Sequence, residues 1–175
     1  MRKQMIWMAG LATVALVGGC TANMQPKSAA KVDAVAQLRD PAGVAHGTAK
    51  IETINGKARV VVEGIALPPG DHGLHIHTVG LCEGPAFASA GPHWNPDMKM
   101  HGRDNPMGAH RGDLPNLQIA TNGTGTVTFD LPGSTAGLLD ADGAAIVVHA
   151  APDDYKTDPS GNSGGRIACG VFTVG

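Results

Sequence analysis

The chain has 175 residues, which is long enough for one domain with a substantial core. Hydrophobic residues make up 42% of it and charged residues 16%, which is typical of a globular protein and excludes a disordered chain. The formal net charge of −2 argues against nucleic acid as a partner.

The N-terminus has the pattern of an export signal. Arg2 and Lys3 precede a mostly apolar segment, residues 5–19, which is too short to span a membrane comfortably. Small residues then lead into Cys20, and this resembles the lipobox of bacterial lipoproteins, in which the cysteine is lipidated. The pattern predicts a lipoprotein signal peptide over residues 1–19 and a protein anchored to a membrane in the periplasm or cell envelope. An ordinary secretory signal with an incidental cysteine is the alternative.

Cys20 and the small polar residues after it, up to residue 31, are expected to form a flexible tether. Residues 32–175 are expected to form a single domain. In this domain, short runs of apolar and β-branched residues alternate with turn signals, among them Asn55-Gly56, a strong hairpin signal. No helical periodicity is convincing, so the pattern predicts an all-β sandwich or barrel. The expected strands are residues 31–40, 48–54, 57–67, 126–132, 144–150 and 166–174.

Two segments are too long for ordinary turns of a compact β domain. Residues 79–116 and residues 150–165 contain no expected strand. Long loops of this kind are usually functional or disordered. Metal ligation is a physical means of ordering them, because it links points that are far apart along a loop.

The first long loop carries three histidines at unusual intervals. His93, His101 and His110 are spaced eight and nine residues apart, which fits neither a helix nor a strand. Together with Asp113 they provide three imidazoles and one carboxylate, a set that suits tetrahedral zinc.

A second histidine group lies outside the long loops. His75 and His77 would project from the same face of one strand, and His149 ends another. Taken singly, these residues could be a surface pair and a half-buried strand-end histidine. As a cluster of imidazoles they would suit copper.

Together these motifs resemble the copper/zinc superoxide dismutases of the bacterial periplasmic kind. The resemblance covers nearly all of residues 32–175. It depends on six segments: HGLHIH (72–77), AGPHWNP (90–96), MHG (100–102), HRGDLPN (110–116), VVHAAPDD (147–154) and GGRIACGV (164–171). It implies a Greek-key β-sandwich, or flattened barrel, with two long functional loops.

The resemblance also implies the metal ligands. The cofactors would be one copper and one zinc ion per subunit, bridged by the imidazolate of His93. The implied copper ligands are His75, His77, His93 and His149, and the implied zinc ligands are His93, His101, His110 and Asp113.

Further roles follow from the same resemblance. Two cysteines remain after Cys20, which in an exported domain favours one disulfide, and the family pairs Cys82 with Cys169. Arg166 would be the active-site arginine that holds the substrate anion. Asp153 would accept hydrogen bonds from one copper-bound and one zinc-bound imidazole, unless it belongs to a solvated turn. His46 and His72 are left without a role.

The expected activity is dismutation of superoxide to O₂ and H₂O₂. Because the chain is net negative and the substrate is an anion, attraction would need a local positive region. Lys99, Arg103 and Lys156 lie in the long loops and could contribute to it. A non-enzymatic metal-binding module and a zinc hydrolase are the alternatives from other classes. Besides superoxide, the expected partners are a membrane, through the lipid, and a second copy of the chain in a homodimer, with a monomer as the alternative.

Overall fold

The structure is a computed structural model and describes residues 30–175. Ten strands and one short 3₁₀ turn, Ala88–Ala90, make up its regular structure. The strands are β1 (Lys31–Arg39), β2 (Ala45–Ile54), β3 (Lys57–Gly64), β4 (Gly70–His72), β5 (Leu74–His77), β6 (Leu117–Ile119), β7 (Gly125–Asp130), β8 (Ala145–His149), β9 (Arg166–Val171) and β10 (Thr173–Val174).

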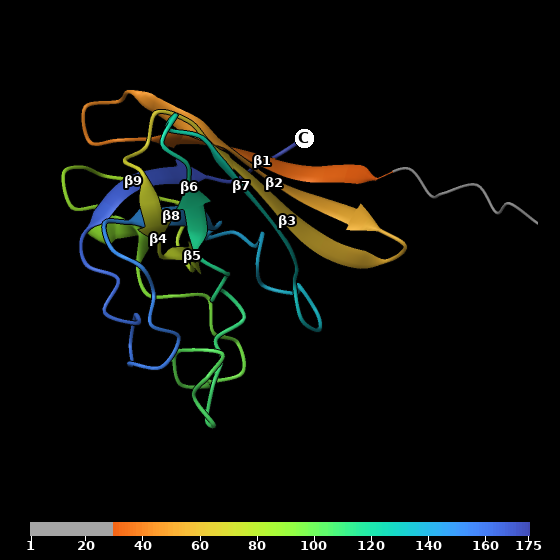
Figure 1. The fold of residues 1–175 in the computed structure, drawn as a ribbon. Coiled ribbons are helices and arrows are strands. Elements are labelled where there is room, and N and C mark those ends of the chain that lie inside the picture. Colours follow the sequence, from red (N-terminus) through yellow and green to blue (C-terminus); the bar gives the residue numbers. More distant parts are fainter. Residues whose placement is uncertain (1–29) are drawn as a thin grey trace, which may run out of the picture.

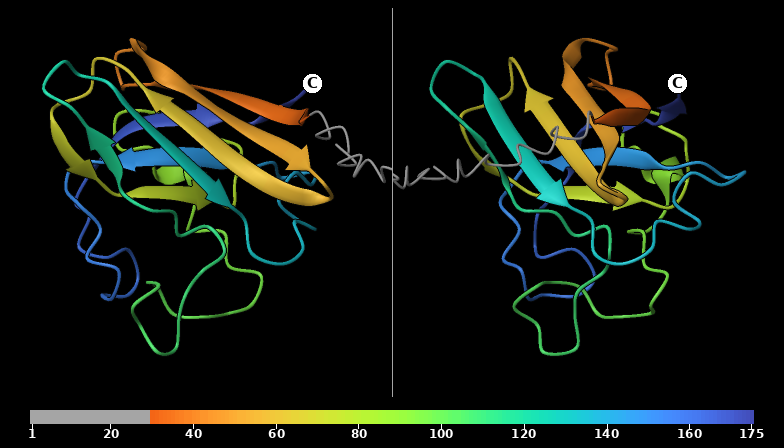
Figure 2. Two further views of the ribbon diagram at one scale, coloured as in Figure 1. Left: turned by 45° about the vertical axis from the view of Figure 1, so that its right-hand side comes forward. Right: turned by 90° about the vertical axis from the view of Figure 1, so that its right-hand side faces the viewer.

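Eight strands form one antiparallel sheet in the order β5-β8-β9-β1-β2-β3-β7, with β10 added beside β1. The neighbours β5–β8, β9–β1 and β3–β7 are not consecutive in the chain, as in Greek-key connections. The sheet curls, so that β1, β2, β3 and β7 lie over β5, β8 and β9 (Figures 1 and 2). The small pair β4–β6 lies beside them. The predicted all-β class is confirmed.

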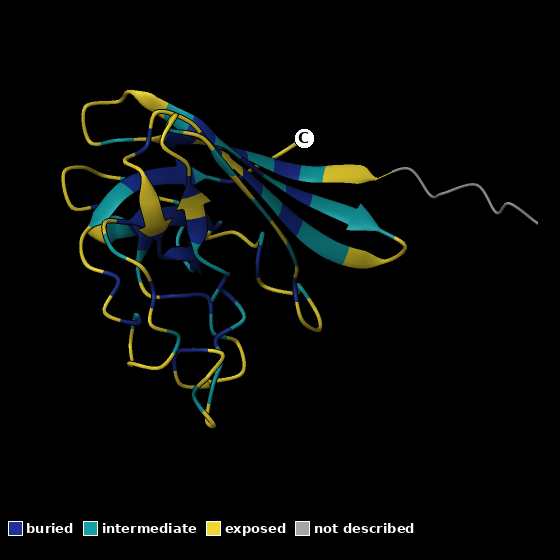
Figure 3. Ribbon diagram, viewed as in Figure 1, coloured by how far each residue is buried: buried dark blue, intermediate teal, exposed yellow. Residues whose placement is uncertain are grey.

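The core lies between the two halves of the curled sheet. In β1, Ala34, Ala36 and Leu38 are buried while the residues between them are more exposed. This is the alternation expected of strands with one face in a core. The corresponding residues of β2, β3, β5 and β8 belong to the same apolar cluster, and Figure 3 shows buried segments along these strands.

Several predicted boundaries were wrong. The strand expected over 57–67 ends at Gly64, and Ala66 has φ 52°, a left-handed turn conformation. The strand expected over 166–174 is divided in two, because β9 pairs mainly with β8 whereas β10 pairs with β1. The short strands β4 and β6 were not expected. The predicted hairpin at Asn55-Gly56 is confirmed, and both residues have positive φ.

Both predicted long loops are present, and they lie at the same side of the sheet (Figure 1). We call residues 78–116, between β5 and β6, the first loop, and residues 150–165, between β8 and β9, the second loop. The predicted disulfide joins Cys82 of the first loop to Cys169 of β9, across 87 sequence positions. No helix in residues 30–175 is long and apolar enough to cross a membrane.

Candidate metal centre

Strand β5 places two histidines on the face opposite the core. Leu74 and Ile76 pack in the apolar cluster, whereas His75 and His77 point to the other face, where the loops cover them. Antiparallel pairing then brings His149 of β8 to the same place. All three side chains are at most 3% exposed.

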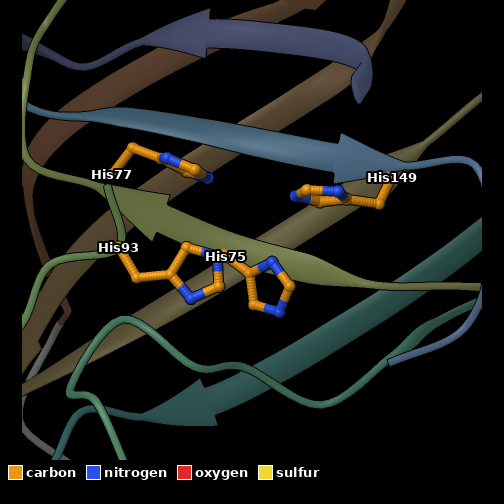
Figure 4. Close-up of side chains that lie close together, drawn as sticks. All are labelled: His75, His77, His93 and His149. Atoms are coloured by element: carbon orange, nitrogen blue, oxygen red, sulfur yellow. The ribbon is translucent and has the colours of Figure 1, made fainter. Parts of the chain in front are cut away.

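His93 of the first loop completes a group of four. One donor atom each of His75, His77, His93 and His149 lies within 4.8 Å of the others. In Figure 4 the rings of His77 and His149 point toward each other, and the rings of His75 and His93 lie next to one another. The loop is held here by a bridge between the backbones of His77 and His93.

In three of these rings one nitrogen has a hydrogen-bond partner and the other has none. His75 Nε2 lies 2.9 Å from Asp153 Oδ2, His77 Nδ1 lies 2.8 Å from the Gly91 carbonyl, and His149 Nδ1 lies 3.1 Å from the Gly164 carbonyl. The opposite nitrogens, His75 Nδ1, His77 Nε2 and His149 Nε2, are buried without a hydrogen-bond partner. Buried polar atoms normally have partners, so three unpaired nitrogens in one group fit a metal ion.

Burial also keeps these three rings neutral. It lowers the pKa of His75 to about 3, of His77 to about 2 and of His149 to about 4. An imidazole must be neutral to offer a lone pair to a metal, so the group is ready to bind one near neutral pH.

A second group centres on Asp113. Its Oδ1 lies 2.9 Å from His93 Nδ1 and 3.1 Å from both His101 Nδ1 and His110 Nδ1. His110 Nδ1 also lies 3.3 Å from His93 Nδ1, and His101 Nδ1 is buried without a hydrogen-bond partner. Three imidazole nitrogens and one carboxylate oxygen therefore converge, the donor set of a tetrahedral zinc site.

The two groups overlap at more than one ring. The set within 4.8 Å around Asp113 contains His75, His93 and His101, so distance alone assigns His75 to either group. The ring of His75 is stacked on that of His93, with centroids 3.9 Å apart. His110 is not in this set, but its contacts with Asp113 and His93 assign it to the second group.

Asp153 of the second loop joins the two groups. It is 3% exposed and accepts hydrogen bonds from His75 Nε2 at 2.9 Å and from His101 Nε2 at 3.0 Å. Burial lowers the pKa of His101, but the carboxylates of Asp113, 3.1 Å from Nδ1, and of Asp153, 3.0 Å from Nε2, outweigh burial and raise the pKa to about 9. Despite burial, hydrogen bonds from His101 and His75 hold the pKa of Asp153 below its usual value.

Arg166 of β9 lies beside the group of four histidines, His75, His77, His93 and His149, which we call the copper-type histidines. Its guanidinium donates to the carbonyls of Phe87 at 2.6 Å and Gly91 at 2.9 Å. Burial lowers the pKa of Arg166, but a guanidinium remains charged at any working pH. Arg166, His93 and His149 line one cavity of about 720 Å³, which we call the main cavity. An anion in it would meet a fixed positive charge beside the imidazoles.

Comparison with known proteins identifies this combination of fold and donor groups. Residues 45–172 match the family model described as copper/zinc superoxide dismutase. The chain belongs to the copper/zinc superoxide dismutase family. The expected class of enzyme and the expected cofactors, copper and zinc, are thereby confirmed at the level of the family.

Named relatives and solved structures agree with this assignment. A copper/zinc superoxide dismutase of Aquifex aeolicus is 40% identical over 78% of this chain and 85% of its own length. A superoxide dismutase-like protein of Bacillus subtilis is 47% identical, but the match covers 60% of this chain and 57% of the relative. A crystal structure of a superoxide dismutase-like protein from Bacillus subtilis has a TM-score of 0.76 and 39% identity, over 82% of this chain and all of that one.

This dismutase-family chain also contains site residues that the sequence did not reveal. The Asn116 side chain accepts from the Asp153 backbone N–H at 2.8 Å and donates to its carbonyl at 3.0 Å. Gly161 lies so close to Asp153 that an added Cβ would overlap the carboxylate. Buried His72, left without a role above, contacts the His149 carbonyl through Nδ1 at 2.7 Å. Asn116 lies 37 positions from Asp153, and His72 lies 77 positions from His149, so no local sequence pattern predicted these contacts.

Proposed function

We propose that this protein dismutates superoxide to O₂ and H₂O₂ at a copper ion that His93 links to a zinc ion as a bridging imidazolate. In this proposal His75, His77, His93 and His149 hold copper. Zinc is held by His93, His101, His110 and Asp113.

The position of His93 carries the proposal. It belongs to both groups of donor atoms, and its Nδ1 lies within hydrogen-bonding distance of Asp113. Nδ1 of His93 therefore belongs to the zinc group, and Nε2 is the nitrogen that remains available to bind copper. Burial lowers the pKa of His93, which favours a ring without an added proton.

The chain's own residues would serve the reaction in two ways. Arg166 would hold the superoxide anion in the main cavity by charge and by its planar donors. Whenever Nε2 of His93 is not bound to copper, this atom would carry a proton, while Nδ1 stays in the zinc group. When bound, copper supplies the one-electron couple that side chains lack, and zinc organises the loop without redox chemistry of its own.

The bridge is tested by replacing His93 and His101 separately. His93→Ala should lower the occupancy of both metals, because one ring serves two ions. His101→Ala should lower zinc content first and keep copper bound. Metal analysis and the visible d–d band of copper measure both effects, and in the unchanged protein that band should shift when zinc is removed.

Two results would contradict the proposal. If His93→Ala keeps both ions and an unaltered copper spectrum, His93 is not a bridge. If the protein loaded with both metals does not dismutate superoxide, the proposal is wrong, and the rival functions of a metal-binding module or a zinc hydrolase remain.

We further propose that the protein works in the cell envelope, attached to a membrane through lipid on Cys20. Residues 1–19 and Cys20, on which this depends, lie outside the described residues. Two or more acyl chains are enough for stable attachment. Cys20→Ser should leave uncleaved precursor and little lipoprotein in the membrane fraction, and unchanged processing of the variant would refute the anchor. A homodimer is a further proposal, which sedimentation equilibrium would distinguish from a monomer.

A further inference from the structure

The methionines of the described chain are concentrated at one place on its surface. Every methionine in residues 30–175, namely Met98, Met100 and Met107, lies in the first loop. Their exposed fractions are 91%, 38% and 64%. Methionine normally fills gaps in apolar cores, and none of these three does so. Exposure of all three within ten positions suggests that their thioethers have a task other than packing.

The loop holds these methionines on an ordered backbone. The N–H of Met100 donates to the Met107 carbonyl at 3.0 Å, so the two residues lie side by side. The side chain of Asn95 bonds to both backbone groups of Lys99, which lies between Met98 and Met100. The arrangement is therefore a structured part of the first loop, which is drawn in green below the strands in Figure 1.

One of the three methionines also borders the main cavity. Met100 lines this cavity together with His93, His149 and Arg166. An ion bound at Met100 could enter the cavity without crossing the core, and His149, whose Nε2 is buried without a hydrogen-bond partner, lies in the wall of the same cavity.

We propose that Met98, Met100 and Met107 form a docking site for Cu(I), from which copper passes through the main cavity to the copper-type histidines. Thioether sulfur is a soft ligand that selects Cu(I), whereas zinc prefers thiolate, imidazole and carboxylate. The site would thus accept copper without competing for zinc. A thioether has no proton to lose, so Cu(I) binding here is independent of pH between 5 and 8. The inference depends on the proposed function only for the destination of the copper.

The test uses zinc-loaded protein, titrated with Cu(I) without oxygen against a coloured Cu(I) chelator. The unchanged protein should bind two equivalents, one tightly at the histidines and one more weakly at the methionines. The triple variant Met98→Leu/Met100→Leu/Met107→Leu should lose the weaker equivalent, because leucine keeps the size but has no donor atom. It should also take up copper at the histidines more slowly. Zinc content should not change, nor should the Cu(II) spectrum recorded after O₂ is admitted to oxidise the bound copper, which shows that the variant is folded.

A second measurement observes the sulfur atoms directly. With ¹³C-labelled methionine methyl groups, Ag(I), a redox-inert soft ion, should shift the signals of Met98, Met100 and Met107 in zinc-loaded protein. Equal Cu(I) stoichiometry and loading rate in the triple variant, or unshifted methyl signals, would overturn the docking site. Neither readout involves superoxide. Failure of the docking site is thus distinguishable from failure of the dismutase proposal.

Discussion

Asp153 Oδ2 and His75 Nε2 are hydrogen-bonded at 2.9 Å although 78 sequence positions separate the two residues. The other oxygen of the same carboxylate accepts from His101. One buried carboxylate thus fixes the orientation of a ring in each donor group, and each ring keeps its Nδ1 free to bind a metal. Replacement of such an outer partner commonly lowers metal affinity by about 10- to 100-fold.

Asp153→Asn should therefore weaken binding of both metals by about 10- to 100-fold. An amide offers one acceptor where the carboxylate offers two, so only one of the two rings keeps its partner. Competition titrations with chelators measure both affinities. Asp104→Asn is the matched control, since it removes the same charge from an exposed site in the first loop. If the two variants bind metals equally well, Asp153 does not position the ligands.

Gly161 should be required for this contact. It has φ 63° and an added Cβ would overlap Asp153 Oδ1, so Gly161→Ala should displace the carboxylate and cost about 1–3 kcal/mol of stability. Gly165→Ala is the control, because no atom lies within 4 Å of its added Cβ. Thermal unfolding and zinc affinity should both decrease in the first variant only. Equal melting temperatures and zinc affinities of the two variants would show that the second loop can accommodate the added Cβ without loss of stability.

Arg166→Ala should keep both metals and lose at least tenfold in activity, equivalent to about 1.4 kcal/mol. Arg166→Lys should lose less, because the charge survives while the planar donor group is lost. The activity of the unchanged protein should fall as salt rises, since the Debye length shrinks from about 10 Å at 0.1 M to about 3 Å at 1 M. The alanine variant should be less sensitive to salt.

Arg59→Ala is the control for this comparison. It removes an equal charge from β3, where Arg59 pairs with Asp130 outside the main cavity. Full activity of metal-loaded Arg166→Ala at low salt would exclude Arg166 from substrate binding. Lys99, which also lines the cavity, would then be the next residue to replace.

The stability of the metal-free protein should be greatest near pH 6.5. His75, His77 and His149 have pKa values far below their usual value of 6.5. Below pH 6.5 the unfolded chain binds protons that the folded chain does not. The stability from these rings is therefore complete above pH 6.5 and is lost as the pH falls toward 4 and lower. His101 behaves in the opposite way, because its pKa is raised to about 9. Its contribution is complete below pH 6.5 and is lost as the pH rises through 9.

Melting temperatures between pH 4 and pH 10 would measure this. Zinc replaces the proton at His101 Nδ1, so the decrease between pH 6.5 and 9 should disappear in zinc-loaded protein. A metal-free protein whose melting temperature does not change from pH 6.5 to 9 would show that His101 is not protonated in the folded state.

Local sequence patterns were sufficient to predict the all-β class, the hairpin at Asn55-Gly56 and the two long loops. These features depend on alternation and turn residues, which act over a few positions. The same alternation predicted that His75 and His77 share one face of a strand. Their assignment to copper, and the pairing of Cys82 with Cys169, came from the motifs shared with the dismutase family.

The groups that surround the ligands are known from the folded structure and not from the sequence. Pairing of β5 with β8 brings His149 to His75, and folding of both loops onto one face places Asp153 between the donor groups. The contact of Asn116 with Asp153, and the place of Met100 beside the main cavity, likewise depend on contacts between distant segments. No local pattern encodes such contacts, because they exist only once the sheet has curled and the loops have closed over it.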